Sequence, residues 1–141
     1  SYFRNFYARR ALRIFPLYYA FLLVVLVLWP IVSQAAPDSL GSKLLTAGYL
    51  GNFLMAFGGW EALPGHTTHL WSLAVEEQFY LIWPFVIFLL PRARKVQLCV
   101  ALIVGAWCLR LAFHTWWPTG IPGYVLLPAR VDTLAAGGLL A

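Results

Sequence analysis

Charged residues are scarce in this chain, and their scarcity narrows the class of protein before any motif is considered. Only 11% of the 141 residues are charged, 62% are hydrophobic, and the mean hydropathy is +0.76. Soluble domains carry roughly 25% charged residues, because the surface left over after a core has formed must face water. The charge here is too little to cover such a surface, so we expect lipid to surround most of the chain.

Acidic residues are the scarcer of the two charged kinds. The chain has five Asp and Glu against ten Lys and Arg, which gives a net charge of +5. The basic residues flank apolar runs and do not form a stripe interleaved with polar residues. This placement argues against nucleic acid as a partner and favours anionic lipid headgroups.

Cysteine is nearly absent, and typical terminal signals are missing. Cys99 and Cys108 lie nine residues apart inside one apolar run, so we interpret both as small hydrophobic residues and expect neither a disulfide nor a metal site. The sequence has no initiator Met, no signal-peptide cleavage site and no polar stop after its last apolar run. We therefore expect residues 1–141 to be a single partial membrane domain, excised from a longer protein.

Long apolar runs dominate the sequence. Four are candidates to cross a bilayer core, which takes about 20 helical residues, and they cover residues 14–32, 70–90, 96–113 and 124–141. A fifth run, residues 44–60, is short and broken by glycines, so it is re-entrant, interfacial or a further span. The sequence thus predicts an all-α fold, a polytopic transmembrane helix bundle with about four spanning helices.

The basic residues predict the orientation of this bundle. Seven of the ten lie in two clusters, residues 1–13 and 91–95, and short cytoplasmic segments are enriched in Lys and Arg. If both clusters are cytoplasmic, an even number of crossings separates them, and the runs 14–32 and 70–90 supply two. Residues 44–60 then make no full crossing; if they do cross, one basic cluster lies outside.

A polar face runs along the start of the second spanning run. His69, Ser72, Glu76 and Tyr80 follow the spacing i, i+3, i+7 and i+11, which is one face of a helix. A charged group at membrane depth costs about 2.5 to 3.5 kcal/mol on insertion scales and is usually kept for a proton, an ion or a partner charge. We expect this face to look into the bundle, where Glu76 would suit acid–base work.

A structural interpretation of the same residues stays open. Glu76 and Glu77 would pair with Arg110 or Arg130 to lock helices together. His69 would be a helix cap or an interfacial residue.

Arginines precede the first spanning run. Arg10 and Arg13 lie three apart, so both guanidinium groups can point the same way and fork onto phosphate oxygens. The alternative is a positive-inside anchor that touches lipid phosphates. Arg130 and Asp132 lie two apart and do not share a helix face, so each should have a partner elsewhere.

Three stretches carry a family resemblance. Residues 69–81, HLWSLAVEEQFYL, resemble the signature of the acyltransferase family 3 membrane proteins, which include bacterial O-acetyltransferases of surface polysaccharides such as lipopolysaccharide. Residues 9–18, RRALRIFPLY, are similar to the arginine motif of that family. Residues 130–141, RVDTLAAGGLLA, resemble a later motif in which Arg-x-Asp precedes a Gly-rich helix. The motifs occur in the expected order and cover the chain from end to end.

The resemblance implies a reaction and its partners. An acyl group, commonly acetyl, would pass from cytoplasmic acyl-CoA, a co-substrate and not a bound cofactor, to a hydroxyl of a sugar or glycan. Arg10 and Arg13 would hold the phosphates of coenzyme A. The further substrate-binding residues we expect are Ser72, Glu77, Tyr80, Arg130 and Asp132. The other partners would be membrane lipids and the rest of the parent chain, in the plasma membrane of a bacterium.

One departure from the family concerns the catalytic base of the acyl transfer. Family members carry an essential His on a helix before the arginine motif, and we expect it upstream of Ser1, so that these 141 residues alone are inactive. His69 and Glu76 are given supporting catalytic roles, with Glu76 orienting a partner while Ser72 and Tyr80 hydrogen-bond to it. A proton-coupled transporter and a helical scaffold without a site are the alternative classes.

Overall fold

Three long helical segments form the body of the molecule. The computed structural model describes residues 2–34 and 38–140. The first segment runs without a break through α1 (Tyr2–Leu23), the π-helical turn η1 (Val24–Leu28) and α2 (Trp29–Ser33). The other two are α5 (Leu70–Leu89) and α6 (Arg92–Trp116). Shorter helices complete the fold, namely α3 (Leu40–Ala47), α4 (Gly51–Gly58), α7 (Ile121–Val125) and α8 (Leu127–Leu140).

The prediction of an all-α membrane bundle is confirmed. Within the described residues, Tyr2–Ser33, Leu70–Leu89 and Arg92–Trp116 are long and apolar enough to cross a membrane. The first helix begins at Tyr2 and not at residue 14, because the basic segment continues the same helix. Hydropathy detects only the apolar part of such a helix.

The fourth predicted span differs from the structure. The chain is extended at Leu126, with ψ at 140°, and this divides residues 124–141 between α7 and α8. The 14 residues of α8 extend about 21 Å, which is less than the roughly 30 Å of a bilayer core. Ala141 lies outside the described residues.

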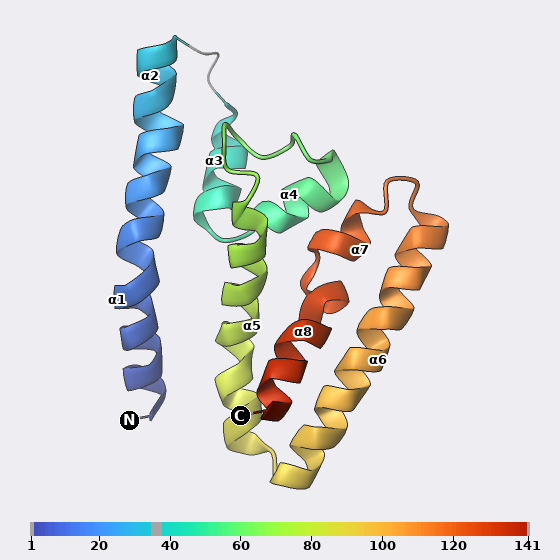
Figure 1. Cartoon of the computed structure of the whole chain (residues 1–141). Coiled ribbons are helices and arrows are strands. Elements are labelled where there is room, and N and C mark those ends of the chain that lie inside the picture. The colour runs from blue at the N-terminus through green and yellow to red at the C-terminus, as the bar shows by residue number, and fades with distance from the viewer. Residues whose placement is uncertain (1, 35–37, 141) are drawn as a thin grey trace.

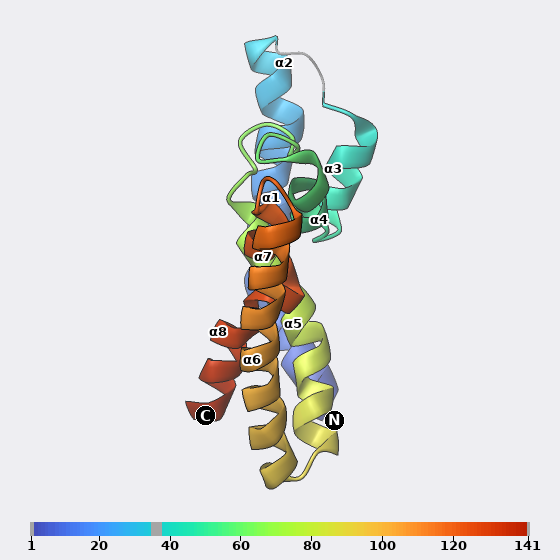
Figure 2. The same ribbon diagram turned by 90° about the vertical axis from the view of Figure 1, so that its right-hand side faces the viewer.

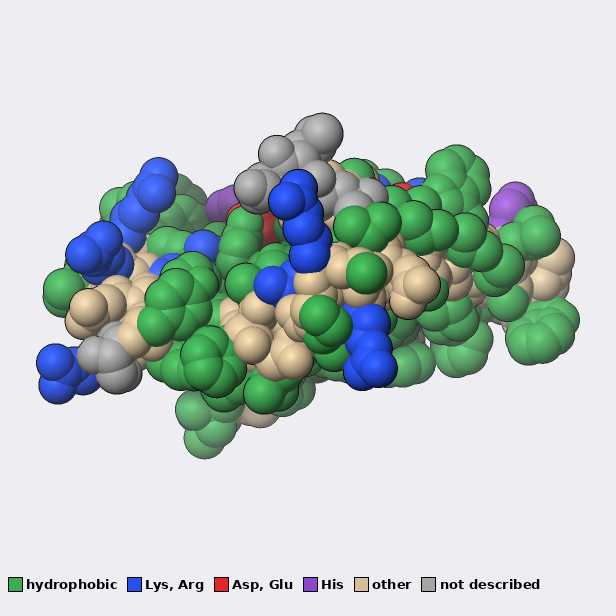
Figure 3. Space-filling model, turned by 90° about the horizontal axis from the view of Figure 1, so that it is seen from below, with side chains coloured by type: hydrophobic (Ala, Val, Ile, Leu, Met, Phe, Trp, Pro, Cys, Tyr) green, Lys and Arg blue, Asp and Glu red, His purple; other side chains and the backbone are tan. Residues whose placement is uncertain are grey.

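Both basic clusters lie at one end of the bundle. The start of α1 and the connection between α5 and α6 both lie at the lower end of Figure 1, whereas α3, α4 and α7 lie towards the other end in both views (Figures 1 and 2). Figure 3 views the molecule from the lower end, where Lys and Arg side chains spread over the face and only small areas are acidic. This arrangement agrees with placing residues 1–13 and 91–95 on one side of a membrane, with Ser1 outside the described residues.

The segment 44–60 folds back on itself. It lies in α3 and α4, helices of eight residues each and about 12 Å long, so neither can cross a bilayer core by itself. The chain reverses at Tyr49, whose φ of 57° is rare for a residue with a side chain. Tyr49 stacks on Tyr18 with ring centroids 4.2 Å apart, and burial raises the pKa of its phenol above the ordinary value.

A buried amide pair ties this folded segment to α5. The side chain of Asn52 is fully buried; its Nδ2 donates to Gln78 Oε1 at 3.3 Å and to the Val125 carbonyl at 3.3 Å. Gln78 Nε2 donates in return to Asn52 Oδ1 at 2.9 Å and to the Tyr49 carbonyl at 2.8 Å. These bonds join three helices and the turn between α3 and α4, so the amide pair fixes the middle of α5 relative to α4 and α7.

Two kinds of packing hold the long helices. Helices α6 and α8 pack against each other, and both carry small buried side chains, those of Cys99, Ala106, Ala129 and Ala135, of the kind that allows close helix approach in lipid. Cys99 thus behaves as the small hydrophobic residue it was predicted to be. Near its lower end, α1 contacts α5 through long side chains, as where Phe3 stacks on Phe85 with centroids 4.9 Å apart. The spacing between α1 and α5 therefore leaves room for a cavity.

The placement of both basic clusters at one end predicts a labelling pattern. With Cys99 and Cys108 replaced by Ala, Ala8→Cys and Ala93→Cys should react with a membrane-impermeant maleimide only in inside-out vesicles. Glu61→Cys, in the loop after α4, should react only in right-side-out vesicles, because it lies at the other end of the bundle. Labelling of Ala8→Cys and Ala93→Cys from opposite faces would contradict the arrangement.

The buried amide pair predicts a stability difference between two amide residues. Asn52→Ala should lower the free energy of unfolding by about 1 to 3 kcal/mol, because Gln78 and the Val125 carbonyl lose a buried partner. Gln97→Ala, which removes an exposed amide on α6, is the matched control and should change it by less than about 0.5 kcal/mol. Unfolding by SDS in mixed micelles measures both, and equal effects would refute the role of the pair.

Candidate functional site

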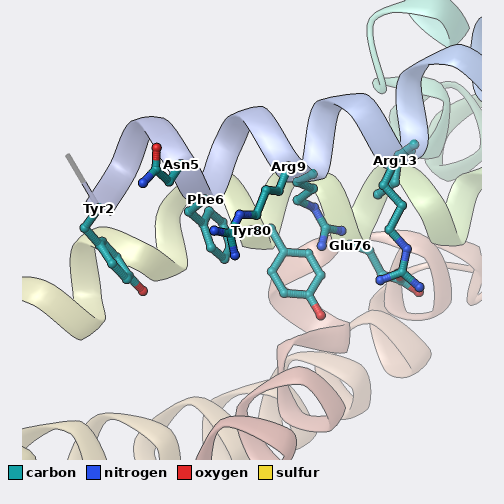
Figure 4. A pocket seen from close by; sticks show the side chains of 9 residues that line it. Tyr2, Asn5, Phe6, Arg9, Arg13, Glu76 and Tyr80 are labelled. Atoms are coloured by element: carbon teal, nitrogen blue, oxygen red, sulfur yellow. The ribbon is translucent and has the colours of Figure 1, made fainter.

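The lower half of α1 and the middle of α5 enclose an open cavity of about 680 Å³. We call it the arginine cavity, and it lies near the end of the molecule that carries both basic clusters. Figure 4 shows Arg9 and Arg13 extending from α1 to the side where Tyr80 and Glu76 of α5 lie. Its lining residues are Tyr2, Asn5, Phe6, Arg9, Arg10, Arg13, Ile14, Glu76 and Tyr80.

Arg10 is held in place by two residues of α5. Its Nη2 and Nε donate to Glu77 Oε1 at 2.7 and 3.0 Å, and its guanidinium lies 3.6 Å from the centroid of the Tyr80 ring. The side chains of Arg10 and Glu77 are only 21% and 15% exposed, so the pair is shielded from solvent. Glu77 compensates the charge of Arg10. The guanidinium N–H groups of Arg10 that do not bind Glu77 remain available to a ligand.

Arg9 and Arg13 differ from Arg10 in that they lack a compensating carboxylate. Among residues 2–34 and 38–140, no ion pair or hydrogen bond involves either side chain. Both are exposed and line the arginine cavity. Two uncompensated positive charges therefore face the cavity, beside the compensated Arg10.

The predicted polar face of α5 is only partly brought together. Glu76 and Tyr80 line the arginine cavity, but Ser72 does not, and its hydroxyl donates to the His69 carbonyl at 3.2 Å instead of to Glu76. Tyr80 places its ring face against Arg10. The expectation that Ser72 and Tyr80 fill the hydrogen bonds of Glu76 is therefore wrong for the described residues, because each makes a different contact.

His69 lies outside the cavity. Its ring contacts the ring of Phe21 edge to face, with centroids 5.4 Å apart, and its side chain makes no capping hydrogen bond to α5. It is the residue just before α5, three residues before Ser72, and it does not line the arginine cavity. A supporting catalytic role for His69 finds no contact in this geometry.

A second, smaller pocket lies between α5 and α8. Its volume is about 170 Å³, and its lining residues are Trp71, Ser72, Val75, Glu76, Arg130, Thr133 and Leu134. We call it the α5–α8 pocket. Glu76 lines this pocket and the arginine cavity alike, so its side chain stands between the two spaces.

Arg130 enters the α5–α8 pocket in a fixed position. Its Nε donates to the Tyr124 carbonyl at 2.8 Å, and its guanidinium lies 4.1 Å from the centroid of the Tyr124 ring and 5.6 Å from that of Trp71. Cation–π contacts of this kind orient an arginine without neutralising it. Arg130 therefore presents a positive charge to the pocket.

Asp132 serves the helix packing and lines neither space. It forms an ion pair with Arg110 of α6 and is 8% exposed. The prediction that Arg130 and Asp132 have separate partners is confirmed by these contacts. The pairing of Glu76 or Glu77 with Arg110 or Arg130 is wrong, since Arg110 is taken by Asp132 and Glu77 by Arg10.

Two features of the site were missed by the sequence reasoning. Arg9 lines the cavity together with Arg13, four residues away, a spacing that equally places two side chains on one helix face. That spacing was a usable signal. The pairing of Glu77 with Arg10 across 67 residues had no such signal, because it depends on how α1 and α5 align.

Comparison with known proteins places the chain in a family. The model of an acyltransferase domain, that of acyltransferase family 3, matches residues 1–140. The chain belongs to acyltransferase family 3. No solved structure matches it. The family match and the three membrane-length helices together make this an integral membrane protein.

Named relatives in the family are much longer than this chain. The peptidoglycan O-acetyltransferase OatA of Listeria monocytogenes is 29% identical over 79% of the chain and 19% of its own length. The O-acetyltransferase OatA of Staphylococcus aureus is 43% identical over 52% of the chain and 13% of its own length. Regulator of hypoxia-inducible factor 1 of Caenorhabditis elegans is 26% identical over 82% and 24%. The chain thus spans less than a quarter of each of these relatives.

The bidentate contact between Arg10 and Glu77 predicts energetic coupling. In a double-mutant cycle of Arg10→Met and Glu77→Gln, the free energies of unfolding should differ from additivity by about 1 to 3 kcal/mol, because the side chains are in shielded contact. A cycle of Arg94→Met with Glu77→Gln is the control, and it should be additive within about 0.5 kcal/mol. Additivity in both cycles would show that the pair does not hold α1 to α5.

Proposed function

We propose that this chain is part of a membrane O-acyltransferase that moves an acyl group, most simply acetyl, from acyl-CoA to a hydroxyl of a cell-surface glycan. The observation that carries the proposal is the arginine cavity in a member of acyltransferase family 3. The names of the bacterial relatives, which are O-acetyltransferases and in one case a peptidoglycan O-acetyltransferase, supply the acyl group and the acceptor class.

The charges of the cavity suit the donor. Coenzyme A carries a pyrophosphate and a further phosphate on its ribose, and planar guanidinium groups bind such oxygens with two parallel hydrogen bonds. Arg9 and Arg13 bring uncompensated charge, and Arg10 is preoriented by Glu77 and Tyr80. Tyr2 and Phe6, in the same cavity, offer ring faces for the adenine.

The position of the cavity suits a cytoplasmic donor. It lies near the end that carries both basic clusters, and positive residues mark the cytoplasmic side of a membrane protein. Acyl-CoA would then enter from the cytoplasm. We propose the bacterial plasma membrane as the location, with residues 1–13 and 91–95 cytoplasmic.

The reaction requires a base and an acyl path. The acceptor oxygen forms a bond to the acyl carbon, the thioester C–S bond breaks, and the proton of the hydroxyl passes through a base to the departing sulfur of coenzyme A. Among the described residues that line the arginine cavity, Glu76 is the carboxylate and no histidine is present. We therefore assign the main base to a histidine outside these 141 residues, which would make the isolated chain inactive, and assign to Glu76 the orientation of the acceptor hydroxyl.

The free charges argue against a scaffold without a site. A purely structural role would leave each intramembrane charge satisfied by another, as Arg110 and Asp132 are. Glu76 has no such partner in the described part of the chain. Arg9 and Arg13 line the same cavity without an ion pair, and these two cations support binding of an anion.

The donor assignment predicts kinetic effects in the full-length protein, assayed by transfer of radiolabel from acetyl-CoA to membrane glycan. Arg13→Ala should raise the KM for acetyl-CoA about ten- to a hundredfold, since a charge-assisted hydrogen bond contributes about 1.5 to 3 kcal/mol. Arg10→Ala should do the same, while Glu76→Gln should lower kcat more than it changes this KM.

Arg94→Ala is the matched control for this experiment. Arg94 belongs to the second basic cluster and lines neither the arginine cavity nor the α5–α8 pocket, so its loss should leave the KM for acetyl-CoA unchanged. If Arg10→Ala, Arg13→Ala and Glu76→Gln all keep wild-type turnover, the assignment of the site is wrong.

A further inference from the structure

We propose that the α5–α8 pocket is the subsite for the acceptor sugar, with Glu76 as the wall it shares with the arginine cavity. The inference rests on the proposed function, since that function supplies the need for an acceptor. Its own evidence is the chemistry of the groups around the pocket.

In this arrangement, the hydroxyl groups of the pocket are placed to accept hydrogen bonds from a ligand. The Ser72 hydroxyl donates its single proton to the His69 carbonyl at 3.2 Å, and the Thr133 hydroxyl donates its proton to the Arg130 carbonyl at 3.0 Å. Each oxygen therefore presents lone pairs and no free proton to the pocket. The carboxylate of Glu76 is likewise an acceptor.

The charged donor of the pocket is Arg130. Its Nε is already used by the Tyr124 carbonyl, which leaves the terminal N–H groups for a ligand. The pocket thus offers three acceptors and one cationic donor. A ligand that fits must donate several hydrogen bonds and accept from one arginine.

Sugar hydroxyls meet this requirement, whereas an isolated anion does not. Each sugar hydroxyl both donates and accepts, so a ring edge can give protons to Glu76, Ser72 and Thr133 while taking one from Arg130. A phosphate or carboxylate in the pocket would have no protons for these acceptors and would face the charge of Glu76. Trp71, Val75 and Leu134 add the apolar walls that the C–H groups of a sugar ring need.

The size and position of the pocket fit one ring edge beside the donor. Its volume of about 170 Å³ is that of about five or six water molecules at roughly 30 Å³ each, so a polymer would extend outside it. A hydroxyl that donates to Glu76 would lie between the α5–α8 pocket and the arginine cavity. The acyl carbon of the donor would then meet this hydroxyl beside Glu76. Holding two substrates next to each other in this way accelerates the transfer of a group between them.

The test uses full-length protein in membrane vesicles with two substrates. The acceptor is a soluble oligomer of N-acetylglucosamine and N-acetylmuramic acid, and the donor is radiolabelled acetyl-CoA. Thr133→Val and Ser72→Ala should each raise the KM for the oligomer about three- to tenfold, because each removes one neutral hydrogen-bond acceptor. The KM for acetyl-CoA should rise by a smaller factor, because neither residue lines the arginine cavity.

Thr115→Val is the matched control. The Thr115 hydroxyl makes the same bond to the carbonyl three residues earlier, at 2.9 Å to Ala112, but lies on α6 away from both spaces. It should leave both KM values at wild type. Thr133→Ser retains the hydroxyl and should restore the wild-type KM for the oligomer, which separates loss of the hydroxyl from disturbance of α8.

Two results would overturn the subsite. One is an unchanged KM for the oligomer in both Thr133→Val and Ser72→Ala, and the other is an equal rise of both KM values, which would make the pocket part of the donor site. Calorimetric binding of the oligomer separates this inference from the proposed function. Wild-type protein that binds the oligomer more tightly than Thr133→Val, yet transfers no acetyl group, would refute the function and keep the sugar subsite.

Discussion

The contact between Arg10 and Glu77 is the interaction on which the site depends. It joins α1 to α5 where long side chains bridge the two helices. The side chains of both partners are largely shielded from solvent, which strengthens the contact. Loss of either partner would leave a charge without compensation in a poorly solvated place, which is costly. The ring of Tyr80 against the same guanidinium adds a second contact from α5. This connection therefore joins the two helices that line the arginine cavity.

The charges of the bundle divide into two groups with different uses. Arg10 with Glu77 and Arg110 with Asp132 are paired between helices and serve to align them. Arg9, Arg13, Glu76 and Arg130 have no ion-pair partner among the described residues and line the two spaces. The first group therefore contributes to helix alignment, and the second group places its charges around two spaces that a ligand can enter. Ion pairing distinguishes these two groups, whereas sequence position does not.

One face of α5 connects the two spaces. Ser72, Glu76 and Tyr80 follow each other at four-residue intervals, about 6 Å apart along the helix, so the face leads from the α5–α8 pocket to the arginine cavity. The middle of this helix is held on two sides, by Asn52 at Gln78 and by Arg10 at the neighbouring Glu77. These contacts keep Glu76, the preceding residue, at the boundary between the arginine cavity and the α5–α8 pocket.

The sequence by itself determined the solvent, the fold class and the angular position of each side chain on its own helix. Low charge and long apolar runs indicate lipid, and helical periodicity places Arg10 and Arg13, or Glu76 and Tyr80, on common faces that the structure retains around one cavity. Only the tertiary structure decided which helices meet and at what height. The pairing of Glu77 with Arg10, the burial of Asp132 against Arg110 and the exclusion of His69 depend on the axial alignment of separate helices. That alignment is set by contacts such as those of Asn52 and Gln78, between residues far apart in the chain, and local periodicity carries no information about them.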